Sequence, residues 1–167
     1  MSVYCENANA DNGWAVGGGY ILRTKDGGAN WTRNTTPLET QMRSVTSYGN
    51  NLVVTGDGGA ILKRTAATNW DDSVDMVAIG LTAATSGTTS QLLAVTYAGG
   101  STPGYASGDA GAIVTTIDDG ANWTLNAGGN DNRLNDSHFR NHTTAQHVAR
   151  DSTSLTTHDR HVPLPSP

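Results

Sequence analysis

One segment of this sequence occurs twice without a gap. Residues 20–32 read YILRTKDGGANWT and residues 112–124 read AIVTTIDDGANWT, so both contain the pattern Thr-x-Asp-x-Gly-Ala-Asn-Trp-Thr. A weaker copy at residues 58–70 keeps the apolar segment and the Asn-Trp pair, but it is one residue shorter and lacks the Asp and the Gly. Periods of about 20 to 50 residues are typical of solenoids and propellers. The repetition therefore predicts an array of similar structural units.

Each copy follows a Gly-rich turn and two short apolar segments, a combination typical of β-hairpins. The turns lie at residues 17–19, 56–59 and 108–111. Each unit is therefore predicted to be a four-stranded antiparallel meander, in which the repeated pattern joins the third strand to the fourth. We place the three units, as blades, at residues 1–37, 38–73 and 74–128.

The spacing of the repeats is uneven. The distance from Trp70 to Trp123 exceeds the distance from Trp31 to Trp70, which indicates an insertion. We place this insertion in the third unit, at residues 75–90, with an extra strand at residues 76–81.

A fourth unit begins after Trp123 but is incomplete. Residues 133–139 stand where a first strand is due, residues 145–148 where a second is due, and residues 155–159 faintly repeat a third. No Gly-x-x-Trp follows, and the Pro-rich segment after it cannot supply inner sheet hydrogen bonds. Residues 129–167 are therefore predicted to form an incomplete fourth blade and an extended tail that contains His and Pro.

Composition narrows the class of protein. A chain of 167 residues has room for one domain. Only 15% of the residues are charged and 20 are Gly, which excludes a helical bundle built on Leu, Lys and Glu. The formal charge is −5 and no basic cluster exists, which excludes nucleic acid as a partner. The apolar stretches fall far short of the roughly 20 residues that cross a bilayer, so no membrane span is expected.

The N-terminal residues and the single cysteine bear on where in or outside the cell the protein is found. The first twenty residues lack a basic start and an apolar block, so we expect no secretory signal in this chain. A place outside the cell and a place in a multi-subunit particle both stay open. Cys5 is the only cysteine, which excludes an internal disulfide and a cysteine metal cluster.

The chemistry of the repeated pattern is that of a tight turn. A short Asp side chain can accept hydrogen bonds from backbone N–H groups within the loop, and Gly can adopt the positive φ that other residues disfavour. A Trp after the turn can fold beneath the hairpin and bury a large apolar ring. These roles are predicted for Thr24, Asp26, Gly28 and Trp31, for Thr116, Asp118, Gly120 and Trp123, and in the damaged copy for Trp70 alone.

The pattern resembles the Asp-box, or BNR repeat, of sialidases, sortilin-type receptors and several propeller lectins. It is most similar to the photosystem II stability/assembly factor-like family, through residues 14–31 and 134–139. The resemblance implies an all-β propeller-like array of about three and a half four-stranded blades with Asp-box hairpins. It also implies that the Asp-box residues are structural, and that the chain binds proteins in building a larger complex. The sequence departs from the family at residues 58–70, at residues 75–90 and over the last 30 residues.

The same pattern predicts which side chains form the core. The predicted core contains Val16, Ile21, Trp31, Val45, Val53, Ile61, Trp70, Val95, Ile113, Trp123 and Phe139.

No set of catalytic residues stands out. A sialidase requires several Arg residues, a Tyr nucleophile and a Glu partner, and neither Glu6 nor Glu39 lies near a Tyr in such a motif. All five histidines lie between residues 138 and 161, in a Thr- and Asn-rich stretch that favours solvated loops over a metal site. We therefore expect a non-enzymatic protein-binding or structural scaffold module with no metal and no cofactor.

Two other functions and several assemblies stay open. Tyr48, Tyr97 and Tyr105 are candidate sugar contacts, so a secreted glycan-binding propeller is the alternative, and a sialidase-like glycoside hydrolase the third. Propellers close with about 4 to 8 blades, so three and a half blades would leave open apolar sheet faces. Self-association is the expected way to cover them. A tight four-bladed closure and truncation from a larger propeller are the competing explanations.

Overall fold

The computed structural model describes residues 1–5, 11–36, 38–48, 51–64, 81–98, 101–126, 133–141, 144–149 and 156–158. Side chains are described for all of these except at 34, 35, 48, 101, 138–141, 144–149 and 156–158. Within these ranges no helix is long and apolar enough to cross a membrane.

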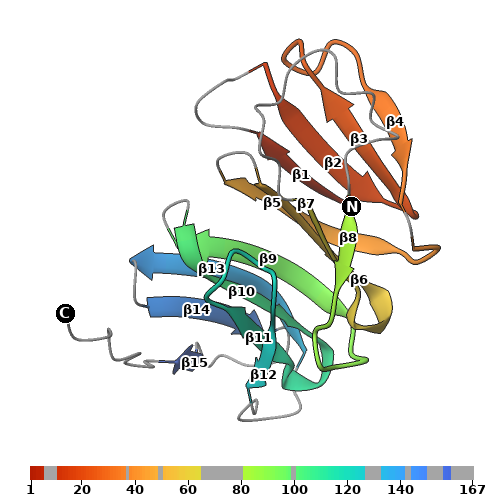
Figure 1. Cartoon of the computed structure of the whole chain (residues 1–167). Coiled ribbons are helices and arrows are strands. Elements are labelled where there is room, and N and C mark those ends of the chain that lie inside the picture. The colour runs from red at the N-terminus through yellow and green to blue at the C-terminus, as the bar shows by residue number, and fades with distance from the viewer. Residues whose placement is uncertain are drawn as a thin grey trace.

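The described residues form four antiparallel sheets, and the neighbours in every sheet are consecutive strands of the chain (Figure 1). The first two sheets comprise β1 (Ser2–Cys5), β2 (Gly13–Gly17), β3 (Tyr20–Thr24) and β4 (Thr32–Thr35), followed by β5 (Met42–Tyr48), β6 (Asn51–Gly56), β7 (Ile61–Arg64) and β8 (Thr82–Ala84). The other two comprise β9 (Leu92–Ala98), β10 (Ser101–Gly108), β11 (Ile113–Thr116) and β12 (Thr124–Asn126), followed by β13 (Leu134–Asn141), β14 (Thr144–Ala149) and β15 (Thr156–His158).

Tight turns join the second and third strands of the sheets. In the second and third sheets these turns are short 3-10 segments, η1 (Asp57–Gly59) and η3 (Asp109–Gly111). Each contains a residue in the left-handed region, Gly58 at φ 67° and Ala110 at φ 53°. The first is Gly, which adopts this conformation without strain. The predicted meanders with Gly-rich hairpins are therefore confirmed.

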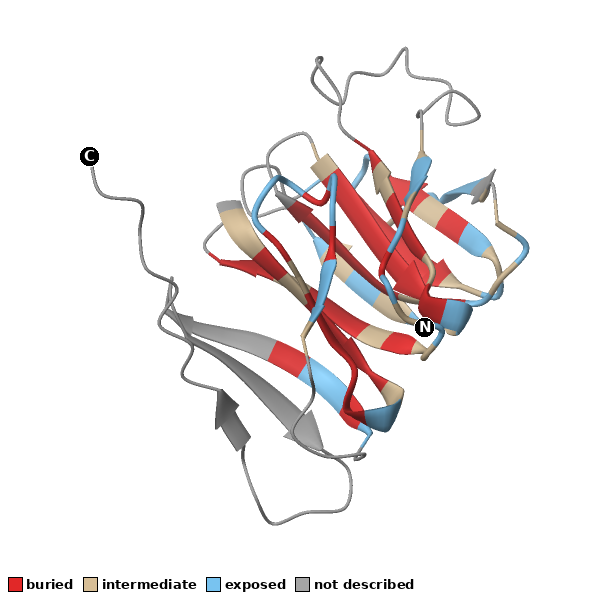
Figure 2. Ribbon diagram, turned by 60° about the horizontal axis from the view of Figure 1, so that its bottom comes forward, coloured by how far each residue is buried: buried red, intermediate tan, exposed pale blue. Residues whose placement is uncertain are grey.

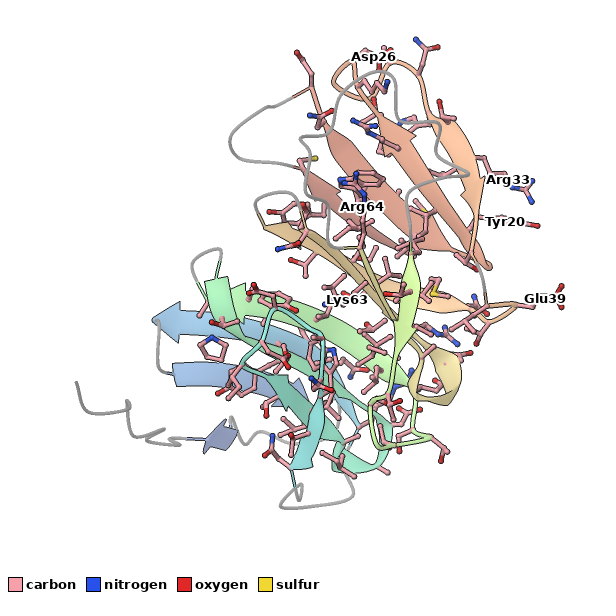
Figure 3. All side chains as sticks on the ribbon, in the orientation of Figure 1. Tyr20, Asp26, Arg33, Glu39, Lys63 and Arg64 are labelled. Carbon is pink, nitrogen blue, oxygen red and sulfur yellow. The ribbon has the colours of Figure 1, made fainter. Side chains whose placement is uncertain are left out.

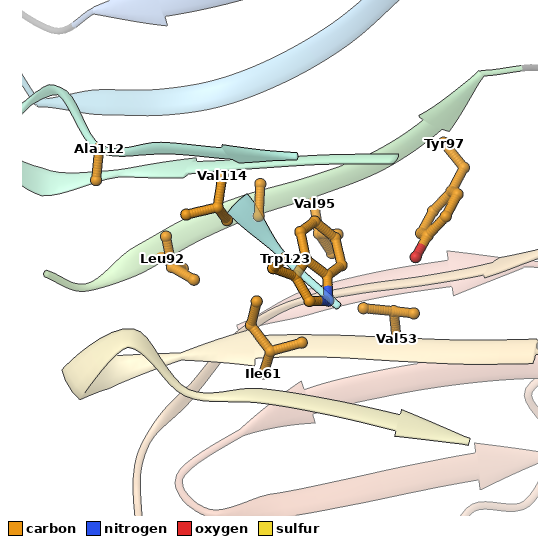
Figure 4. Packing of buried hydrophobic residues seen from close by; sticks show 9 residues of the cluster. Val53, Ile61, Leu92, Val95, Tyr97, Ala112, Val114 and Trp123 are labelled. Atoms are coloured by element: carbon orange, nitrogen blue, oxygen red, sulfur yellow. The ribbon is translucent and has the colours of Figure 1, made fainter. Parts of the chain in front are cut away.

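The sheets pack face to face in chain order. One apolar cluster joins the first and second sheets and includes Trp14, Ile21, Leu52 and Leu62. A second cluster joins the second and third sheets, where Trp123 lies among Val53 and Ile61 from one side and Val95 and Val114 from the other (Figure 4). Between the third and fourth sheets the hydroxyls of Ser107 and Ser137 share a buried hydrogen bond. Buried residues accordingly concentrate where sheets face each other (Figure 2).

Strand register explains why each sheet has two apolar faces. In an antiparallel pair, opposed residues point to the same face and successive residues alternate. In the third strands, Ile21, Ile61 and Ile113 face the following sheet. The residues after Ile61 and Ile113, Leu62 and Val114, face the preceding sheet, and Leu22 points to the corresponding face of the first sheet. The central sheets are therefore covered on both faces.

Most of the predicted core is confirmed by burial. Trp31 is the exception, because 39% of its surface is exposed, and the prediction that it lies in the core is wrong. Trp70 lies outside the described residues, as does the side chain of Phe139. The confirmed members are Val16, Ile21, Val45, Val53, Ile61, Val95, Ile113 and Trp123.

The predicted boundary between residues 73 and 74 is wrong. Strand β8 pairs with β7, with Ile61 opposite Ala84, so the second sheet continues to Ala84. The longer spacing of the repeats therefore falls inside the second unit, between its third and fourth strands, and not at the start of the third. Strand β8 reads Thr-Ala-Ala and lies at a sheet edge, so its sequence carries no apolar alternation. The extra strand predicted at 76–81 falls outside the described residues, apart from Leu81, which is not in a strand.

Candidate functional site

The turn of residues 24–31 joins β3 to β4 and is organised around the carboxylate of Asp26. Its Oδ1 accepts hydrogen bonds from the Thr24 hydroxyl and the Asn30 backbone N–H, both at 2.8 Å. Its Oδ2 accepts one from the Asn30 side-chain amide at 2.7 Å. Both carboxylate oxygens are therefore occupied by donors within the turn itself.

Two further hydrogen bonds complete this turn. The Gly28 N–H donates to the Thr24 hydroxyl at 2.9 Å, and the indole Nε1 of Trp31 donates to the Gly28 carbonyl at 3.1 Å. Gly28 has φ 93°, a conformation that L side chains rarely adopt. The chain can reverse here because Gly stands at that position.

The turn of residues 116–123 repeats these contacts between β11 and β12. Asp118 accepts from the Thr116 hydroxyl and the Asn122 N–H at 2.8 Å, and from the Asn122 amide at 2.7 Å. Gly120 has φ 80°, and its N–H donates to Thr116 at 2.9 Å. The indole N–H of Trp123 donates to the Gly120 carbonyl at 3.2 Å. The two turns are copies in geometry as well as in sequence.

These hydrogen bonds set the ionisation of the two carboxyls. The backbone N–H of Asn122, followed by its side-chain amide, lowers the pKa of Asp118 from 3.8 to about 2. The Asn30 backbone and side chain likewise lower the pKa of Asp26. Donors that stabilise a carboxylate favour its charged form. Both aspartates are therefore anions held by their own loops.

The two Trp side chains differ although their turns agree. Trp123 is 7% exposed and meets Tyr97 edge-on, with ring centroids 6.4 Å apart. Trp31 lies beside Gly13, where a Cβ would stand 3.7 Å from its Cη2, and it keeps 39% of its surface exposed. The difference follows from the preceding sheet, which covers Trp123, whereas within the described part of the chain no sheet covers Trp31.

The second sheet lacks the pattern at this position. By strand register, Arg64 occupies the place that Thr24 and Thr116 hold in the other sheets. Arg64 is buried, and this burial, followed by the charge of Arg23, lowers its pKa below the usual value of an arginine. The predicted turn that follows, including Trp70, lies outside the described residues.

Of the three tyrosines predicted as sugar contacts, the two whose side chains the structure describes lie on opposite faces of the third sheet. Tyr97 is 7% exposed and packs on Trp123 between two sheets, so its prediction as a surface contact is wrong. Tyr105 is half-buried and stands opposite Thr96 and Thr115, on the other face of the third sheet. The side chain of Tyr48 lies outside the described residues.

Two open hollows lie at the other ends of the strands. One of about 910 Å³ is bounded by η1 and by the connections before β5 and after β8, including Glu39, Asp57 and Thr85. The other, of about 590 Å³, is bounded by the β2–β3 turn, Tyr20 and Arg33. Residues 38–40 line both hollows, so we treat them as one groove. Figure 3 shows Asp26 and Glu39 near opposite ends of the strands of the first sheet.

Two arginine side chains contact residues that line this groove. The guanidinium of Arg43 contacts both carboxylate oxygens of Asp57, at 2.6 and 2.9 Å. The guanidinium of Arg33 lies 3.3 Å from the centroid of the Tyr20 ring. Glu39 is exposed. Sequence reasoning missed the groove, because the Gly-rich turns signalled hairpins while the connections that complete its walls have no recurring pattern.

The described residues bring together no metal cluster. Within them, no group of three or more His, Cys, Asp or Glu side chains is placed to hold an ion. The histidines from His138 onward have side chains outside the described residues.

Comparison with known proteins identifies the class of fold. No protein-family model matches the sequence, and no curated protein matches it. Solved structures do match at low identity, and the three described next share the β-propeller architecture of stacked antiparallel sheets. The prediction of a β-propeller is thereby confirmed.

The structures are two of YCF48 and one of an ancestral GH74 enzyme. YCF48 from Cyanidioschyzon merolae has a TM-score of 0.73 at 17% identity, over 90% of this chain and 48% of that one. YCF48 bound to D1 peptide has a TM-score of 0.62 at 18% identity, over 90% and 50%. The GH74 enzyme has a TM-score of 0.57 at 9% identity, over 93% and 25%. This chain spans about half the length of the YCF48 chains.

Proposed function

We propose that this chain is a non-enzymatic protein-binding module of a larger assembly, and that the groove along residues 38–40 receives an extended peptide. The observation that carries the proposal is the likeness to YCF48 bound to D1 peptide, which extends over 90% of this chain. The resemblance to the assembly factor-like family in the repeated pattern points the same way. Fold likeness alone does not select a partner, so the site must be tested directly.

The groove has features suited to an extended chain. Its lining includes Gly58, Gly59 and Gly87, so main-chain groups stand close to its surface. An extended peptide can bind such a surface through its own backbone, while side-chain pockets select its sequence. Glu39 adds an exposed negative charge beside both hollows.

The groove is less suited to glycoside hydrolysis. That reaction uses two carboxyl groups as acid and base or nucleophile. Among the described lining residues of the groove, the carboxylates are Glu39 and Asp57, and Asp57 is bound by Arg43. The lectin alternative rested on Tyr48, Tyr97 and Tyr105, and of these Tyr97 is buried between two sheets. We therefore propose neither function.

We further propose that the two Asp turns are structural Asp-boxes. Both oxygens of each carboxylate already accept hydrogen bonds from within the turn. A calcium ion or a sugar hydroxyl would have to displace these donors. The turns also lie at the strand ends remote from the groove.

A peptide-display selection on the purified chain tests the proposed function. Selected peptides are measured by fluorescence anisotropy against Thr85→Arg, in the groove, and Ile117→Arg, an exposed position at the opposite end of the strands. We expect Thr85→Arg to raise Kd at least about tenfold, equivalent to about 1.4 kcal/mol, and Ile117→Arg to leave it unchanged.

Two outcomes would contradict the proposal. Equal Kd values for Thr85→Arg and the wild type would move the site away from the groove. Failure to select any peptide, together with glycan binding that Tyr105→Ala removes, would replace the protein-binding function by a lectin function.

A further inference from the structure

The two hollows of the groove differ in the charged side chains of their walls. The described lining of the larger hollow contains two carboxylates, those of Glu39 and Asp57, and neither Lys nor Arg. The described lining of the smaller hollow contains Arg33 as well as Glu39. Figure 3 shows Arg33 and Glu39 along the same side of the structure. The described walls are therefore acidic in the larger hollow and of mixed charge in the smaller one.

The carboxylate of Asp57 is already neutralised by an arginine behind the wall. Its Oδ1 and Oδ2 atoms accept hydrogen bonds from Nε and Nη2 of Arg43, at 2.6 and 2.9 Å. The hydrogen bond to Asp57 raises the pKa of Arg43, and the charge of Asp109 adds to this shift. Oδ1 of Asp109 in turn lies 3.0 Å from Nε of Arg133. Two aspartates and two arginines therefore alternate here, and their formal charges sum to zero.

The carboxylate of Glu39 leaves the larger hollow with a net negative charge. Its side chain is exposed, and among the described residues it has no hydrogen bond or ion pair. It lines both hollows, so a ligand that extends along the groove passes it. The guanidinium of Arg33 instead stands over the Tyr20 ring in the smaller hollow. A ligand in the larger hollow therefore meets one uncompensated carboxylate.

The wall that follows β8 is preformed and offers further acceptors. The Ser86 hydroxyl donates to the Thr88 carbonyl at 3.0 Å and accepts from the Thr88 N–H at 3.3 Å. This wall packs closely on η1, because a Cβ on Gly59 would overlap the Thr88 carbonyl oxygen. A preformed surface reduces the ordering cost of binding. The hydroxyls of Thr85 and Thr89 are on exposed residues of this wall and can accept hydrogen bonds from an ammonium or guanidinium group.

We propose that the groove selects a basic peptide segment, with a Lys or Arg side chain in the larger hollow beside Glu39. This inference rests on the proposed peptide-binding function and names the chemistry of the ligand. The formal charge of the chain, −5, favours the approach of positively charged partners from a distance. Complementary charges contribute more to specificity and association rate than to affinity. The preference for basic peptides should therefore be clear even where the gain in affinity is modest.

The peptide-display selection tests this preference directly. Relative to the starting library, we expect the selected peptides to be enriched in Lys and Arg and depleted in Asp and Glu. The strongest selected peptide then serves as the probe for fluorescence anisotropy at low salt. Glu39→Gln should raise its Kd about three- to fivefold, as expected for an exposed ion pair. Replacing the basic residue of the peptide by Gln should have the same effect, and both changes together should have no larger effect than either alone.

Asp119→Asn is the matched control for the loss of one negative charge. Asp119 is exposed in the turn of residues 116–123, away from the groove, and Asn readily adopts its backbone φ of 59°. This variant should leave Kd unchanged. An exchange of charges gives a second control, because Glu39→Lys should weaken binding of the basic peptide and favour a peptide in which the basic residue is replaced by Glu.

The outcomes separate this inference from the proposed function. Selected peptides that are sensitive to Thr85→Arg but not enriched in Lys or Arg would overturn the inference and leave the proposed function standing. Equal increases in Kd for Glu39→Gln and Asp119→Asn would mean that the overall charge of the chain attracts the peptide, which would also overturn it. Failure to select any peptide would remove the proposed function and this inference together.

Discussion

The turns of residues 24–31 and 116–123 have the same hydrogen bonds but differ in what surrounds them. The distances from Asp26 and Asp118 to their donors agree to 0.1 Å. Trp123 is nevertheless buried while Trp31 is exposed. The shape of this turn is therefore a local property of its eight residues, and the burial of its Trp depends on the neighbouring sheet.

A difference between corresponding residues of β9 and β1 accounts for part of the difference in burial between the two Trp side chains. Tyr97 of β9 stands over Gly104 and packs against Trp123. The corresponding residue of β1 is Cys5, which is too small to do the same for Trp31. The third sheet is therefore filled on this face by two aromatic rings, and the first sheet by one.

The largest expected difference comes from removing the two indoles. Trp123→Ala should lower the free energy of unfolding by about 3 to 5 kcal/mol, because it leaves a cavity between two sheets. Trp31→Ala should cost about 1 to 2 kcal/mol, because less apolar area is lost. Urea denaturation at low protein concentration measures both. Equal losses would mean that Trp31 is covered in solution.

Adding a methyl group beside each Trp gives the next largest contrast. A Cβ on Gly104 would lie 2.6 Å from Cε1 of Tyr97, whereas one on Gly13 would lie 3.0 Å from Cγ2 of Thr24. Gly104→Ala should therefore cost about 1 to 3 kcal/mol through overpacking. Gly13→Ala should cost less than about 1 kcal/mol. Thermal melts of both variants decide the order, and a reversed order would contradict the contrast in packing.

Removal of the Asp26 or the Asp118 carboxylate should destabilise the two turns equally, unlike removal of their Trp side chains. Asp26→Ala and Asp118→Ala each remove an acceptor of three hydrogen bonds, so both should lower Tm by a similar amount, on the order of a few degrees. Lys25→Ala changes an exposed neighbour of Asp26 and serves as the control. An unchanged Tm in both Asp variants, with loss of a bound sugar or calcium ion, would show that these residues form a ligand site.

The smallest expected effect is the pH dependence of the stability that Asp118 contributes. Folding lowers the pKa of Asp118 from 3.8 to about 2, so its contribution to stability is complete above about pH 3.8. That contribution is lost as the pH falls from about 3.8 to about 2. The difference in urea midpoint between wild type and Asp118→Ala should therefore shrink over this range and stay constant between pH 5 and 7. A constant difference down to pH 2 would contradict the lowered pKa.

Much of the fold was predictable because its signals are local. The Gly-rich turns and the alternation around Val53, Ile61 and Ile113 predict hairpins and buried strands from neighbouring residues alone. The same holds for the Asp turns, whose hydrogen bonds all lie within one segment. Repetition then indicates the array of sheets.

The rest depends on contacts between sheets, which a linear pattern does not encode. Trp31 and Trp123 both follow the sequence Gly-Ala-Asn, yet within the described residues a sheet covers only Trp123. Nothing in the sequence around Tyr97 distinguishes it from other strand tyrosines, and its burial follows from its contact with Trp123 in the folded structure. Strand β8 is recognised by its pairing with β7, since Thr82 to Ala84 carry no apolar signal. The groove likewise arises where connections from separate blades meet.

The strict chain order of the strands has a consequence for how the molecule folds. Each strand hydrogen-bonds to its neighbours in sequence, so every sheet can form through short-range contacts before the next is made. Repeat architectures of this kind can nucleate in one unit and propagate to the next. A sheet that has just formed presents an apolar face until the next sheet packs on it, and within the described residues no sheet packs on the face of Val3 and Leu22.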